Sequence, residues 1–219
     1  MHLEIPKLPA HGFKDFAKHY LMIVLSVLTA LGLEAWIEHI HHTHAATLAS
    51  HQITAELRAN LDDVQKSYRS NQQRLVSLQQ LDDAIAKDVR DGKPDAAINQ
   101  HIQALRKEFR LSLDWPIFAN QAWDVAVANQ SATWMDGAVF SKYSAAYSKQ
   151  RDAANWMSQD SSLFLDAPRL ATLSTRIDLG RDVDPVEFLS VLSQMMITSS
   201  ETQSHLQQVE SQLKSTLPD

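Results

Sequence analysis

The sequence predicts an all-α protein in which one N-terminal transmembrane helix continues into a long stalk helix, packed with about three further helices as a bundle. Three observations predict this class. Residues 20–33 (YLMIVLSVLTALGL) form an apolar run of the kind that crosses membranes. Residues 57–89 carry apolar side chains at the intervals of a heptad repeat. Only 5 glycines and 7 prolines occur in 219 residues, a composition typical of long helices rather than sheets.

The apolar run reaches the length of a membrane span when its flank is included. From Tyr20 to Ile37 the only charge is Glu34, and this stretch measures roughly 27 Å at about 1.5 Å per residue, close to the hydrocarbon thickness of about 30 Å. Tyr20 and Trp36 then fall near opposite interfaces, where amphipathic aromatic residues are enriched. We therefore predict a transmembrane helix at residues 19–40. The alternative is a core helix of a soluble bundle, but the run lacks the polar stripe of such a helix.

The charges on either side of the run predict its orientation. Lysines precede the run, whereas no Lys or Arg follows it until Arg58. The positive-inside rule then gives a cytoplasmic tail at residues 1–18 and a periplasmic helical domain at residues 41–219, in a single-pass protein of the bacterial inner membrane. A cleaved signal peptide is the alternative and gives the same compartment, but its n-region would be unusually long.

The stalk helix follows without a break, because no Gly or Pro occurs between Gly32 and Gly92. Asn71 takes one position of its apolar seam. Two interpretations stay open: a register-fixing polar residue in a coiled coil with a partner or second copy, or a side chain satisfied inside a monomeric bundle. We expect Gly92 and Pro94 to end this helix.

Further helices are expected to follow in short succession. The second has apolar residues on one face from Ile98 to Phe109, and we expect it to end or kink at Trp115-Pro116. One short helix plus an apolar turn is expected at 117–135. Asp136 can cap a long helix over residues 137–165.

The last part of the chain predicts one more long helix. Residues 169–182 are interrupted by Gly180, and we expect one helical turn there. Asp184-Pro185 and Glu187 then form a strong start signal, with Asp184 as the cap and Pro185 in the first helical position. We expect that helix to fade before Pro218, with no further apolar run that returns the chain across the membrane.

Composition excludes several classes of function. The net charge is −6 and no basic cluster stands out, which argues against a nucleic-acid-binding surface. Without cysteine the chain has no disulfide, no thiol catalysis and no Cys-ligated zinc. No phosphate-binding glycine loop and no strand–turn–helix elbow around a serine occurs. We therefore expect no enzymatic activity.

The segment where the chain leaves the membrane is rich in histidine. Its candidate metal ligands are Glu38, His41, His42 and His44. Imidazole and carboxylate groups at helical spacing can bind zinc, copper or nickel. Two other interpretations remain open: these residues hydrate the outer membrane interface, or they form a pH-sensitive collar that gains charge near pH 6.5.

The order of these features is similar to that of a group of bacterial single-pass membrane proteins of unknown function. The resemblance is carried by a Trp-bearing membrane exit (residues 33–38), the long heptad helix, a Trp-containing stretch (residues 123–135), and a helix with Tyr143 and Tyr147. It implies an anchored, periplasmic, coiled-coil-like domain and no activity. We expect a scaffold, assembly factor or accessory subunit acting by protein–protein contacts, with a partner or a second copy held through residues 57–89.

Overall fold

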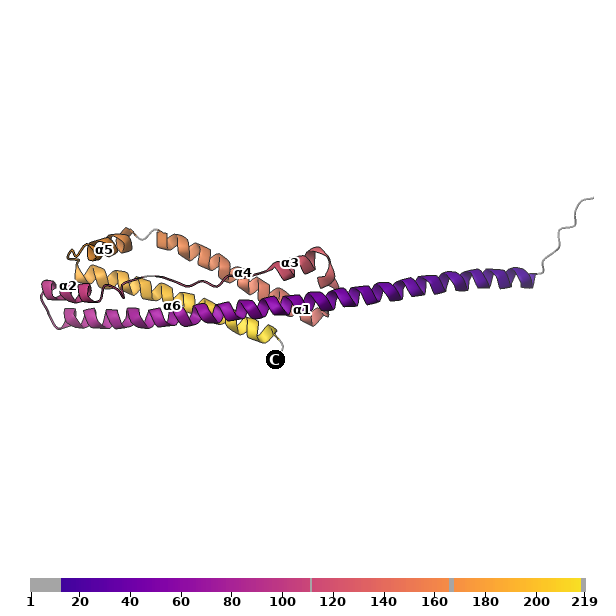
Figure 1. Ribbon diagram of the computed structural model, residues 1–219, viewed down its shortest axis with the longest axis horizontal. Helices are drawn as coiled ribbons and strands as arrows, with labels where there is room; N and C mark the ends of the chain where they lie inside the picture. Colours follow the sequence, from indigo (N-terminus) through magenta and orange to yellow (C-terminus); the bar gives the residue numbers. More distant parts are fainter. Residues whose placement is uncertain (1–12, 111, 166–167, 218–219) are drawn as a thin grey trace, which may run out of the picture.

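One helix, α1 (Phe13–Arg90), runs the whole length of the molecule (Figure 1). The computed structural model describes residues 13–217 except 111, 166 and 167. In this part of the chain all regular structure is helical. The remaining elements are α2 (Asp95–Ala104), α3 (Gln121–Ala128), the 3-10 helix η1 (Ser131–Trp134), α4 (Gly137–Leu165), α5 (Pro168–Asp178) and α6 (Pro185–Thr216). The predicted all-α class is confirmed, with α2, α3 and α5 as short additions to the long helices.

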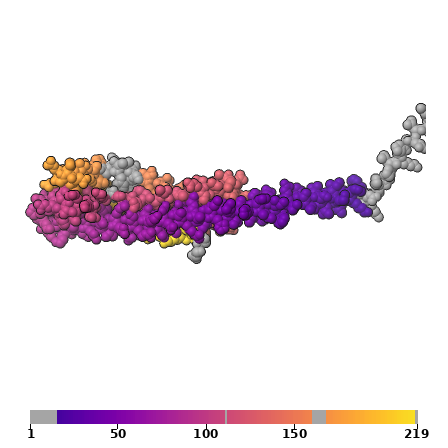
Figure 2. Space-filling model, in the orientation of Figure 1, coloured from indigo at the N-terminus to yellow at the C-terminus, as the bar shows by residue number. Residues whose placement is uncertain are grey.

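Helix α1 has two parts with different surroundings. It contains 78 residues, about 117 Å at 1.5 Å per residue. Its first part projects alone from the body, and its second part is the spine of the body (Figures 1 and 2). Side chains 16–41 are exposed apart from the half-buried Val24, and the first buried residue is Ala46. Among the described residues, α1 alone is long and apolar enough to cross a membrane. The predicted continuity of the apolar run with the long stalk helix is therefore confirmed.

The body packs around α1 and α6, which lie along each other. Its proximal core, nearest the projecting part of α1, joins α1 to α3, η1, α4 and the second half of α6, whereas its distal core joins α1 to α2, α5 and the first half of α6. The heptad seam of α1 is buried in these cores at Leu57, Val64, Leu78 and Ile85. This seam is thus covered within one chain.

Two segments differ from the predictions. Helix α2 ends at Ala104 instead of near Trp115, and residues 112–120 form an extended connection. Backbone N–H and C=O groups of this connection form hydrogen bonds with side chains of α1 rather than the i to i+4 bonds of a helix. The Asn71 amide donates to the Asp114 carbonyl (2.8 Å) and accepts from the Asp114 N–H (2.8 Å). Of the two interpretations of Asn71, the structure shows the side chain satisfied inside one chain.

The second difference is α5, which is an 11-residue helix where one turn was expected. Gly180 follows this helix in the left-handed conformation (φ 65°). The Gly180 N–H donates to Ile177 (3.0 Å) and the Arg181 N–H to Arg176 (2.8 Å), a Schellman motif. The glycine therefore ends a helix rather than preventing one. Gly92 (φ 67°) ends α1 in the same way, as predicted.

Candidate functional site at the proximal end of the body

The chain from α3 to α4 forms a turn that lies against α1 near its exposed part. The Ala122 N–H donates to Glu56 of α1 (2.9 Å), and the Tyr147 hydroxyl donates to the same carboxylate (2.6 Å). The Tyr143 hydroxyl shares hydrogen bonds with Ser50 (2.7 Å) and Thr54 (3.0 Å). These contacts fix residues 128–136, which we call the tip, at the end of the body nearest the projecting part of α1 (Figure 1).

The buried phenol of Tyr147 is a permanent donor in this arrangement. Burial, followed by the hydrogen bond to Glu56, raises the pKa of Tyr147 well above its usual range. The hydroxyl thus stays protonated, so it holds α4 against α1 without adding a second negative charge.

The tip ends in an aromatic contact with the histidine-rich segment. The Trp134 ring stacks on the His42 ring with 3.8 Å between centroids and 10° between planes. Gln130 turns the chain at φ 64° into η1, and the Ser131 N–H donates to the Asn129 side chain (3.0 Å). His42 also lies 3.3 Å from a Glu38 carboxylate oxygen, measured from Nε2. Trp134 still exposes 52% of its surface.

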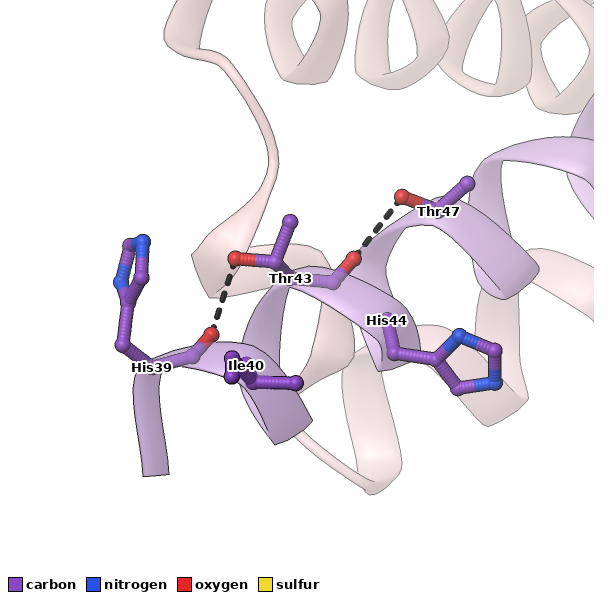
Figure 3. A pocket seen from close by; sticks show the side chains of 5 residues that line it. All are labelled: His39, Ile40, Thr43, His44 and Thr47. Atoms are coloured by element: carbon purple, nitrogen blue, oxygen red, sulfur yellow. Dashed lines mark hydrogen bonds between the residues drawn. The ribbon is translucent and has the colours of Figure 1, made fainter. Parts of the chain in front are cut away.

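Three of the four candidate metal ligands lie close together around the helix axis. Each residue turns about 100° around the axis, so His41 and His42 each lie within about 60° of Glu38, whereas His44 lies about 120° from it. Figure 3 shows His39 and His44 pointing apart at a shallow hollow that Ile40, Thr43 and Thr47 also line. Among the described residues, no group of three or more His, Asp or Glu side chains is placed to hold a metal ion. Metal binding by Glu38, His41, His42 and His44 stays a prediction.

Charge is sparse at this end of the body. No Lys or Arg occurs between Lys18 and Arg58, or between Arg110 and Lys142. The one charged residue in the tip is Asp136, whose carboxylate caps α4 by accepting from Ala138 (2.9 Å) and Val139 (3.2 Å). A second shallow hollow, of about 320 Å³, lies between α1 and the tip, lined by both Trp134 and Asp136.

A different cluster of titratable groups lies at the distal end of the body. The buried Asp88 carboxylate accepts from Lys93 Nζ (2.7 Å) and lies 2.6 Å from His101 Nδ1. The hydrogen bonds from Lys93 and then His101 lower the pKa of Asp88 below its usual value. This cluster joins α1 to α2. No sequence motif signals it, because the three residues belong to different elements.

No protein-family model, no curated protein and no solved structure matches this chain. The resemblance to bacterial single-pass proteins therefore rests on the order of features alone. The structure shows one apolar N-terminal helix that could cross a membrane, and an all-helical body in the described part of the chain.

Proposed function

We propose that this protein is anchored in the bacterial inner membrane by α1, and that its body acts as a scaffold, assembly factor or accessory subunit through protein contacts, without catalysis. Residues 1–18 would lie in the cytoplasm and the body in the periplasm. The observation that supports this is the continuity of α1, one helix from the apolar run to the spine of the body. A continuous helix has a fixed rise per residue, so it holds the body at a set height above the bilayer.

A partner would contact the outer face of the stalk rather than its heptad seam. The seam is buried within the chain, but between residues 57 and 89 α1 keeps a polar exposed face. Its exposed side chains include Arg58, Asp62, Lys66, Arg69, Gln73, Gln80, Asp83 and Lys87. Mixed charge of this kind favours a specific, reversible contact over a permanent apolar one.

Site-specific photo-crosslinking in native membranes tests this proposal. A photoreactive residue in place of Gln73, on the outer face, should give a defined cross-linked partner or dimer. The same residue in place of the buried Leu78 should not give that product. A chain that forms no position-dependent adduct from any exposed residue of 57–89 would contradict the proposal.

Membrane attachment and orientation are tested separately. The full-length protein should stay with membranes at alkaline pH, and a reporter fused to its C-terminus should be active in the periplasm. Release by alkali, or a cytosolic reporter, would contradict the proposed anchor or its orientation.

The second candidate is metal binding or pH sensing by the exit segment, favoured by the contact between Glu38 and His42. Tag-free protein purified without nickel resin should then contain zinc, copper or nickel. The metal should be lost from His41→Ala and His42→Ala but kept in His205→Ala, because His205 stacks on Trp156 in the body. Metal-free protein, or unchanged metal in the first two variants, would end this candidate.

A further inference from the structure

The tip of the body contacts α1 just beyond its apolar part. Trp134 stacks on His42, five residues beyond Ile37, which is about 7.5 Å along the helix axis. A bilayer has about 30 Å of hydrocarbon and about 40–45 Å with headgroups, so each headgroup layer is roughly 5–8 Å deep. Trp134 thus falls at the outer margin of that layer if α1 spans the membrane as proposed.

The composition of the tip fits a headgroup layer. Its exposed residues are Ala128, Asn129, Gln130, Thr133, Trp134 and Asp136. Trp is enriched at membrane interfaces because it has a large apolar ring and one N–H donor. The side-chain amides of Asn129 and Gln130 can donate to phosphate and ester oxygens. The one carboxylate, Asp136, is already engaged in capping α4.

The same surface fits other partners less well. An acidic protein or nucleic acid would need cationic side chains on this surface, and residues 111–141 contain no Lys or Arg.

Helix tilt affects the depth of the tip. The body lies to one side of α1, so the average helix tilt of about 20° can lower a point about 10 Å from the axis by about 3 Å. This tilt can bring the tip fully into the headgroups.

We propose that the tip, residues 128–136 with the exposed Trp134, rests in the outer headgroup layer of the bilayer that α1 crosses. This inference rests on the proposed anchor and adds a second lipid contact. The two contacts fix the tilt and rotation of the body, which one helix alone does not set.

The absence of natural cysteine makes a spin-label experiment direct. Full-length protein with one introduced cysteine is labelled with a nitroxide and placed in phosphatidylcholine vesicles. The three sites are Thr133→Cys in the tip, Trp36→Cys in the span, and Leu179→Cys, which is 70% exposed after α5 at the distal end (Figure 1). Collision rates with a water-soluble nickel chelate and with oxygen then report the depth of each label.

The expected order of nickel accessibility is lowest at 36, intermediate at 133 and highest at 179. Adding Trp134→Ser to the Thr133→Cys chain should raise accessibility at 133 toward that at 179. Adding Val186→Ser, which removes an exposed distal side chain, should leave it unchanged. The protection at 133 should persist in high salt and at low protein-to-lipid ratio.

Each other outcome would overturn the proposed lipid contact, the role of Trp134 or the anchor itself. Protection at 36 with accessibility at 133 equal to that at 179 overturns the inference and leaves the anchor intact. High accessibility at 36 shows that α1 is not embedded, and the proposed function fails with it. Protection at 133 that disappears on dilution in lipid assigns the tip to a second copy and overturns the lipid contact. Protection at 133 without any change in Trp134→Ser also overturns the assigned role of Trp134.

Discussion

Single asparagines attach the connecting segments of this protein to its helices. Each of three buried side chains binds both the N–H and the C=O of one residue in a distant segment. The pairs are Asn60 with Ala119, Asn71 with Asp114, and Asn99 with Val183. An amide side chain offers a donor and an acceptor side by side, so it satisfies an extended residue much as a neighbouring strand would. The backbone N–H and C=O groups of these three connecting residues are thus paired with side chains of the helices.

Asn71→Ala should lower the free energy of unfolding by about 1–3 kcal/mol, because it leaves the Asp114 N–H and C=O without partners beside α1. Gln72→Ala is the matched control, since Gln72 is the exposed neighbour on the same helix. Urea unfolding followed by circular dichroism measures both. Equal stability of the two variants would show that this bond contributes nothing.

The Asp88 cluster predicts a pH dependence of stability. The pKa of Asp88 is lower in the folded chain than its unfolded value of about 4. The stabilisation is therefore fully present above about pH 4 and is lost as the pH falls through the folded value. At pH 5 the Tm of Asp88→Asn should be lower than that of the wild type, and this difference should shrink below about pH 4.

Asp62→Asn is the control for this measurement, because Asp62 is an exposed carboxylate of the same helix. It should follow the wild-type Tm across the range. The assignment to Asp88 fails when the difference between wild type and Asp88→Asn stays constant down to pH 2.5.

At the scale of elements, capping residues determine where the long helices α4 and α6 begin. Asp184 accepts from the Glu187 N–H (2.8 Å) and Pro185 occupies the first helical position, so α6 begins where predicted. Asp136 likewise starts α4 at Gly137. These start signals are local in sequence, which is why the bounds of the long helices could be predicted.

Asp184→Ala should cost about 1 kcal/mol of unfolding free energy, since it removes the acceptor for an N–H at the start of α6. Asp182→Ala removes a carboxylate of equal charge two residues earlier, outside the helix, and should have little effect. Thermal unfolding of both variants at pH 7 makes the comparison. A loss of the same size in both would assign the effect to net charge rather than to capping.

The features that sequence reasoning missed depend on contacts between distant segments. The pattern from Ile98 to Phe109 predicts a continuing helix, yet α2 ends at Ala104, and further along the connection the Asp114 carbonyl binds the Asn71 side chain of α1. The stack of His42 on Trp134 joins residues far apart in the chain. The spacing of the histidines could therefore indicate an unusual segment, but it could not identify Trp134 as the residue that stacks on His42.

At the scale of the whole molecule, the body and the projecting part of α1 are separate in their packing. Side chains 16–41 contribute no buried residue, whereas both cores lie beyond Ala46. The body is thus expected to fold without the anchor. The apolar part of α1 lies outside the packing of both cores.

A chain of residues 39–219 should therefore be soluble, keep the helical circular dichroism of the body and unfold in urea within about 0.5 kcal/mol of the full-length protein in the same detergent. A chain of residues 61–219 is the matched control. It lacks Ile53 and Leu57, both fully buried in the proximal core, and deleting such side chains costs at least 2–5 kcal/mol for each leucine-sized group, so it should be unfolded or aggregated. If the longer chain also failed to fold, residues 13–38 would have to contribute to the body, and the division between an anchor and an independent helical body would be wrong.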